Sequence, residues 1–270
     1  MIHWILQKNL IRPQLLEQLL KAIEADGAIC QKIQVIPFSE ELNLSLKETI
    51  QPIFYGSTTL MLNAYKNPQL RKGVFYNPTT FTMSNYVAQW KENTLNCKGK
   101  IVQLQEIEQI ASKPKQKWFI RPNEDSKTIA GQLKPFDELV AWSRKIIALG
   151  LPDLHAESLL WIAPPQPIDK EWRAFIVDKE IVAISRYMNN GHLDISQTDM
   201  PTTLLQFIKT QIEVYNLSDV YAIDIAETNK AFKIIECNCF NGTGFYGHNV
   251  FAIVGAINDF VRRKIIKNPK

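Results

Sequence analysis

Several features that would place the 270-residue chain in a specialised class are scarce or absent. No segment approaches the roughly 18 consecutive apolar residues of a membrane span. The chain opens with MIHWILQK and shows no basic region, long apolar run or cleavage site, so no secretion signal is expected. Cysteine is rare, and the spacing of the four cysteines suggests no disulfide framework: Cys30, Cys97, Cys237 and Cys239. A reducing cytoplasm is therefore the expected location.

Strong charge and common nucleotide motifs are also missing. The formal charge of +4 is too small to indicate a nucleic-acid partner, and nucleotide phosphates would explain a local excess of Lys and Arg. There is no GxxxxGK[ST] loop, no HRD and DFG pair, no repeat and no low-complexity segment. What remains is an ordinary globular composition, 46% hydrophobic and 21% charged, long enough for one large domain or two small ones.

The first 99 residues predict a small α/β unit with a mostly parallel sheet. A helix begins near Pro13, carries one apolar stripe and stops at positions 26–27. The segments KIQVIPF (32–38) and QPIFYG (51–56) are predicted strands. Hydroxyl residues at 57–59 then lead into a helix, and this junction is either an ordinary helix cap or an anion site built from free backbone N–H groups. A further helix is predicted over about 83–93.

Two more units are predicted, over 100–162 and 163–270. The first contains the strand KWFIRP (117–122), the polar loop NEDSKTIAG (123–131), a helix over about 135–149 and the strand LLWIAPP (159–165). The second contains a strand pair that begins at EWRAFIVD (171–178), a helix after position 201, the hairpin YAIDIAETNKAFKIIECN (221–238) and a final helix over about 249–265.

Oxygen-bearing side chains interrupt the apolar strands of this hairpin. Glu236 and Asn238 share a face because strand side chains alternate, and Asp224 joins them if the connecting loop has an odd number of residues. Two facing carboxylates repel unless a cation lies between them, and carboxylates with an amide oxygen suit Mg²⁺. The alternative is a hairpin with scattered polar residues. Cys237 and Cys239 should face the core, and a zinc site there would need two more ligands, with His248 the one nearby candidate.

An Asp on one strand and Glu-x-Asn on the next resemble the metal-binding end of the ATP-grasp superfamily. The resemblance extends in ordered motifs over about residues 100–265. It implies a mixed α+β fold in which a small N-terminal α/β domain (1–99) precedes two subdomains (100–162 and 163–270) that enclose the nucleotide. KWFIRP is similar to the family's F-I-K-P strand, with Arg121 in place of the usual lysine, as in one branch of the superfamily.

The resemblance also implies roles for further residues. Arg121 would bind an α- or β-phosphate, Lys127 would close over the phosphates, and the backbone of Leu160, Trp161 and Ile162 would contact adenine. EWRAFIVD fits the pattern E-x-R-x-F-x-V-D, which places Glu171 at the nucleotide and Arg173 at the γ-phosphate. Arg186 would share that catalytic role or bind a substrate carboxylate, and the loop residues Gly244 and Tyr246 would contact substrate. Without the family, each reads as a structural arginine, a solvated lysine, a buried strand or a plain turn.

The predicted function is an ATP- and Mg²⁺-dependent carboxylate–amine ligase that acts through an acyl-phosphate. The branch with arginine favours a peptide or protein substrate, and a small amino acid remains open. The alternatives are an ATP-binding module without ligation chemistry and a phosphotransferase that acts on a carboxylate or hydroxyl group.

Overall fold

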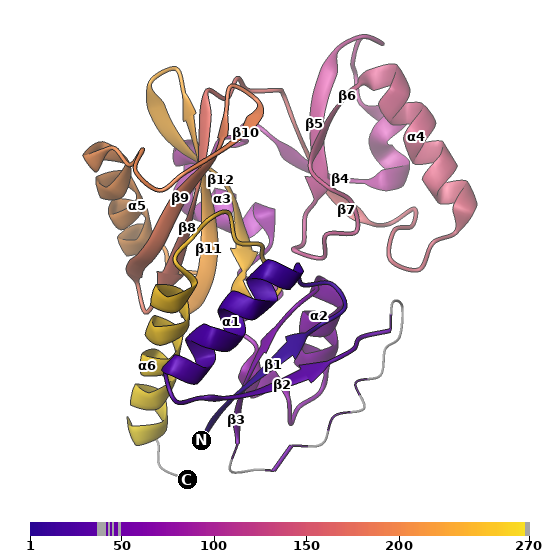
Figure 1. Cartoon of the computed structure of the whole chain (residues 1–270). Coiled ribbons are helices and arrows are strands. Elements are labelled where there is room, and N and C mark those ends of the chain that lie inside the picture. The colour runs from indigo at the N-terminus through magenta and orange to yellow at the C-terminus, as the bar shows by residue number, and fades with distance from the viewer. Residues whose placement is uncertain (37–41, 43, 45, 48–49, 268–270) are drawn as a thin grey trace.

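The structure is a computed structural model that describes residues 1–36, 42, 44, 46–47 and 50–267 (Figure 1). Three sheets form within these residues. Short 3₁₀ helices lie at Arg71–Gly73, Lys91–Asn93, Leu104–Gln109 and Phe240–Gly242. No helix in the described part of the chain is both long and apolar enough to cross a membrane.

The N-terminal sheet is parallel, as predicted, with the order β2-β1-β3. Its strands are β1 (Ile2–Gln7), β2 (Ile29–Ile33) and β3 (Gln51–Tyr55), so β2 begins and ends before the predicted segment 32–38, whose last two positions lie outside the described residues. Helix α1 (Pro13–Ala25) begins with proline at its first turn, as expected. Helices α2 (Thr58–Lys66) and α3 (Met83–Trp90) follow β3.

The second sheet is antiparallel and has the order β4-β7-β5-β6. Its strands are β4 (Lys100–Gln103), β5 (Lys117–Pro122), β6 (Gln132–Pro135) and β7 (Leu159–Ala163). Helix α4 (Phe136–Leu149) packs on the sheet through Phe136 and Leu139, and it ends at Gly150, whose φ of +59° is a left-handed cap.

The third sheet is antiparallel and has the order β10-β9-β8-β11-β12. Its strands are β8 (Lys170–Val177), β9 (Glu180–Asn189), β10 (His192–Ser196), β11 (Val220–Thr228) and β12 (Ala231–Cys239). One face packs on α3 and α5 (Thr202–Val214), and the other packs on α6 (Val250–Lys267) and the N-terminal sheet (Figure 1). Cys237 and Cys239 lie in the first of these cores, as predicted.

The hairpin of β11 and β12 corrects the predicted loop length. The turn consists of Asn229 and Lys230, both with positive φ (51° and 64°), as in a type I′ turn, so the loop is even rather than odd. A bulge supplies the missing residue, because Asp224 pairs with Glu236 whereas Ile225 pairs with Ile234. Asp224 therefore still faces Glu236.

Candidate functional site

Two arginines from different sheets meet the acidic face of the β11–β12 hairpin. On β8, Arg173 lies directly opposite Asp224 and binds it with two nearly parallel hydrogen bonds, Nε–Oδ1 at 2.7 Å and Nη2–Oδ2 at 2.6 Å. Both residues are buried, at 5% and 2% exposure. Burial raises the pKa of the Asp224 carboxyl, and the neighbouring Arg173 opposes that rise.

At the end of β5, Arg121 reaches the same hairpin from the second sheet. Its Nη1 lies 2.6 Å from Glu236 Oε2 and 3.2 Å from the Tyr86 hydroxyl, and its Nε donates to the carbonyl of Pro122. Arg121 is 6% exposed, whereas 30% of the Glu236 side chain is exposed. Burial alone would raise the pKa of Glu236, but Arg121 and Arg173 outweigh it and hold that pKa below its usual value.

Asn238 joins the two acidic groups. Its Nδ2 lies 3.3 Å from Asp224 Oδ2 and 3.3 Å from Glu236 Oε1, so the three residues predicted to bind metal converge. No cluster of three or more His, Cys, Asp or Glu suited to a metal occurs among the described residues. Two carboxylates and an amide fit Mg²⁺, which takes few protein ligands, once the Asn238 amide turns its oxygen toward the carboxylates.

The loop after β12 completes the surroundings of Arg173. Nη1 of Arg173 donates to Thr243 Oγ1 (2.9 Å) and to the carbonyl of Gly244 (3.0 Å). The guanidinium also lies 4.9 Å from the centre of the Tyr246 ring, which stacks on Tyr187 at 4.7 Å. The predicted substrate residues Gly244 and Tyr246 are therefore in contact with Arg173.

Glu171 lies at the edge of this aromatic pair. Its Oε2 accepts a hydrogen bond of 2.7 Å from the Tyr187 hydroxyl. Burial raises the pKa of Glu171. Tyr187 was not among the predicted residues, because a tyrosine in an apolar strand looks like a core residue.

The loop between β5 and β6 lies against the same region. Lys127 has a positive φ of 54°, and its Nζ donates to the carbonyl of Gly242 at 3.1 Å. Asp125, which the sequence analysis missed, is 2% exposed and accepts a 2.8 Å hydrogen bond from the backbone N–H of Cys239. Burial raises the pKa of Asp125. A polar loop gives no sequence signal for a buried carboxylate.

The sequence matches a family of ATP-grasp domains, described as family 3 of its clade, over residues 63–257. The chain belongs to this family. No curated protein has a sequence that matches the chain.

Solved structures of ATP-grasp proteins share the fold. The structure of D-alanine–D-alanine ligase from Bacillus anthracis complexed with ATP aligns with a TM-score of 0.64 at 10% identity, covering 99% of this chain and 100% of that one. The D-cycloserine synthetase DcsG gives 0.61 at 12% identity, covering 96% and 99%. The ATP-grasp ligase PsnB complexed with minimal precursor gives 0.57 at 10% identity, covering 97% and 98%. At these identities the similarity establishes the fold, which is the one predicted.

Arg186 does not join this ATP-grasp site, which corrects its predicted catalytic and substrate-binding role. Continuing the pairing of Glu171 with Met188 would place Arg186 opposite Arg173, but a bulge at Tyr187 shifts the strands so that Ser185 faces Arg173. Arg186 therefore points to the other face and forms ion pairs with Asp194, at 2.7 Å, and with Asp199.

The prediction of adenine contacts by Leu160, Trp161 and Ile162 is also wrong as stated. Strand β7 is a central strand that pairs with β4 on one side and β5 on the other at each of these positions. Its backbone donors and acceptors are therefore used within the sheet. Backbone groups that bind adenine have to come from the segment after Ala163.

His248 supports the site from behind rather than binding zinc. Its Nδ1 accepts a 3.0 Å hydrogen bond from the Tyr246 N–H, so its Nε2 carries the proton and donates to the carbonyl of Arg173 at 2.9 Å. Burial lowers the pKa of His248 to about 4, which keeps the ring neutral.

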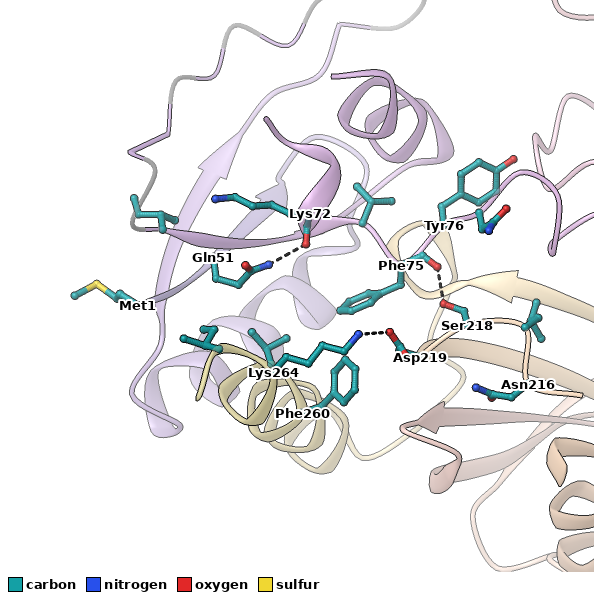
Figure 2. Close-up of a pocket in the computed structure, with 16 residues that line it drawn as sticks. Met1, Gln51, Lys72, Phe75, Tyr76, Asn216, Ser218, Asp219, Phe260 and Lys264 are labelled. Atoms are coloured by element: carbon teal, nitrogen blue, oxygen red, sulfur yellow. Dashed lines mark hydrogen bonds and ion pairs between the residues drawn. The ribbon is translucent and has the colours of Figure 1, made fainter. Parts of the chain in front are cut away.

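A cavity of about 800 Å³ lies away from this cluster, between the start of β3, the end of α6 and the segment before β11 (Figure 2). Phe75, Tyr76 and Phe260 provide much of its apolar lining, and Lys264 pairs with Asp219 across it at 2.5 Å. None of the predicted site residues lines this cavity.

Proposed function

We propose that the protein is an ATP-dependent ligase that joins a carboxylate to an amine through an acyl-phosphate. The observation that best supports this function is the pair of arginine–carboxylate contacts, Arg121–Glu236 and Arg173–Asp224, that Asn238 links within one site. These contacts bring phosphate-binding and metal-binding groups together. Membership of the ATP-grasp family and the ligases among its structural relatives support the same conclusion.

Nucleotide binding would exchange the partners of these ion pairs. Mg²⁺ would be held by Asp224, Glu236 and Asn238, where it would neutralise phosphate charge. The arginines released from the carboxylates would turn to phosphate oxygens, for which the guanidinium fork is well suited. Arg121 would hold an α- or β-phosphate in the place of the family's usual lysine, which is the arginine-bearing branch proposed for this chain. Lys127 would add a further positive charge from its loop.

Arg173 is placed to act on the transferred group. In the proposed reaction a substrate carboxylate oxygen attacks the γ-phosphorus and ADP leaves. An amine then attacks the acyl carbon, and inorganic phosphate leaves. Arg173 would stabilise the charge that develops on the transferring phosphoryl group, with Thr243 and the Tyr246 ring fixing its position. Glu171 and Tyr187 would border the same space.

The proposed organisation follows the sheets. Residues 1–99 would form the N-terminal domain, and 100–162 and 163–270 would enclose the nucleotide, with adenine against the segment after Ala163. The substrate would be an amino acid or a peptide. Structural relatives with titles that name D-alanine and a precursor peptide support both choices. A cytoplasmic location is proposed because the sequence lacks a disulfide framework.

An ADP-release assay tests this function. The protein is incubated with MgATP and a panel of amino acids and dipeptides, singly and in pairs, and products are weighed by mass spectrometry. The expected result is ADP release with a product whose mass is the sum of both substrates minus water. Release of ADP with a phosphorylated single substrate would instead indicate a phosphotransferase.

A further inference from the structure

The carboxyl ends of β1 and β3 form a switch point in the N-terminal sheet. Helix α1 packs on one face of this sheet, against Trp4 and Leu6, whereas α2 packs on the other, against Ile5 and Phe54. With the strand order β2-β1-β3, the chain therefore changes face between β1 and β3. Open α/β sheets bind ligands in the crevice outside the strand ends at such a point.

Gln7, the last residue of β1, lies in this crevice with an unused donor. Its Oε1 accepts a 2.8 Å hydrogen bond from the N–H of Ser57. Gln7 is 1% exposed, yet its Nε2 has no partner among the described residues. Buried amide groups are nearly always hydrogen-bonded, so this donor indicates a missing acceptor. Gly56 makes room for it, because a Cβ there would lie 2.7 Å from Gln7 Oε1.

The first turn of α2 offers more donors at the same place. Ser57 Oγ accepts the N–H of Leu60 at 3.1 Å. The N–H groups of Thr58 and Thr59 have no acceptor within the described part of the chain. Unpaired N–H groups and the helix dipole give such an end a partial positive charge that favours anions.

The loop after β12 joins this crevice to Arg173. A Cβ on Gly242 would lie 3.4 Å from the backbone nitrogen of Thr58. The carbonyl of Thr243 accepts a 2.8 Å hydrogen bond from the Tyr55 hydroxyl, and its Oγ1 accepts one from Arg173. Lys127 contacts the carbonyl of Gly242. The crevice and the proposed reaction site therefore share one loop, which two cations contact.

We propose that this crevice binds a free carboxylate of one substrate through Gln7 and the N–H groups of Thr58 and Thr59. The proposal rests on the proposed ligase function, because the same molecule would present its reacting group to Arg173. The substrate would then carry a carboxylate that does not react. An amino acid and the C-terminal end of a peptide both provide this group.

Nuclear magnetic resonance with acetate tests the carboxylate site directly. The ¹⁵N-labelled protein is titrated with sodium acetate and, separately, with acetamide at matched ionic strength. Acetate should shift the amide signals of Thr58, Thr59 and the Gln7 side chain saturably, and acetamide should bind at least tenfold more weakly. Equal responses to both molecules, or no response to acetate, would overturn the proposal without any variant having to fold.

A matched pair of variants identifies the role of Gln7. Gln7→Met removes the amide at nearly constant volume and should weaken acetate binding about tenfold, as expected for a hydrogen bond to a charged group. Gln51→Met makes the same change at the opposite end of the sheet and should leave acetate binding unchanged. Equal affinities in the two variants would contradict the assignment of Gln7.

Two further titrations separate the sources and the underlying function. Alanine and alanyl-alanine compete with acetate, and the better competitor distinguishes a free amino acid from a peptide end; competition by neither would exclude both. Mg²⁺ with AMPPNP, a non-hydrolysable ATP analogue, should shift the Nε–H signals of Arg121 and Arg173. If those signals stay unchanged while acetate still binds, the nucleotide site fails and the carboxylate site stands.

Discussion

Replacing Glu236 with glutamine separates the two roles that the structure gives this residue. Repulsion between Asp224 and Glu236 alone would predict a more stable variant. The 2.6 Å contact with Arg121 reverses that expectation, because Glu236→Gln leaves a buried guanidinium without its facing anion. Breaking a fully buried pair costs about 3–5 kcal/mol. Since 30% of the Glu236 side chain is exposed and glutamine still accepts a hydrogen bond, a loss of about 1–2 kcal/mol is expected.

Urea unfolding with and without Mg²⁺ and AMPPNP measures both effects. At a ligand concentration of 100 times Kd, the wild type should gain about 2.7 kcal/mol in free energy of unfolding. Glu236→Gln should gain clearly less at that concentration, because a proposed metal ligand has lost its charge. Glu108→Gln breaks an exposed ion pair with Arg144 and should change neither quantity measurably. A Glu236→Gln protein as stable as wild type, or equally stabilised by nucleotide, would refute the reasoning.

Other changes test the arginines and the buried histidine. Arg121→Ala should weaken binding of Mg²⁺ and AMPPNP about tenfold or more in calorimetry, whereas Arg121→Lys should keep part of the affinity. Arg173→Ala should lower ADP release more than nucleotide affinity, because its partner charge grows in the transition state. Arg186→Met should leave nucleotide affinity at the wild-type level, since this side chain faces away from the site. Because the pKa of His248 is about 4 in the folded state and 6.5 when unfolded, the unfolded state binds more protons between those values; stability should fall by about 3 kcal/mol from pH 6.5 to 4, a slope lost in His248→Gln and kept in His192→Gln.

Sequence patterns predicted the elements and the hairpin chemistry well. Pro13 marked the first helix, Gly150 marked the end of α4, and the alternation of Glu236 with Cys237 predicted which side chain faces the core. These features depend on neighbours in sequence, where backbone geometry and side-chain alternation decide the outcome.

The errors have a common physical cause in strand register. One extra residue at Tyr187 moved Arg186 to the wrong face, and one at Ile235 compensated for an even turn. A bulge reverses which side chains face the site, and no composition signal marks it. Long-range pairing also decided that β7 is central, which excludes its backbone from binding adenine.

Contacts between distant segments could not be predicted either. Arg121 and Glu236 lie 115 positions apart, and their ion pair depends on how the second and third sheets pack. Asp125 in a polar loop and Gln7 at a strand end are ordinary in sequence. Their significance comes from burial and from the partner that each has or lacks.

The most direct test of ligase function follows the oxygen atoms. A carboxylate substrate labelled with ¹⁸O is supplied with MgATP and an amine, and the inorganic phosphate is analysed by mass spectrometry. Attack of the carboxylate on the γ-phosphorus, followed by loss of phosphate to the amine, predicts one ¹⁸O atom in each phosphate and ADP release that requires both substrates. Unlabelled phosphate, or ADP release that is independent of the amine, would contradict ligation through an acyl-phosphate.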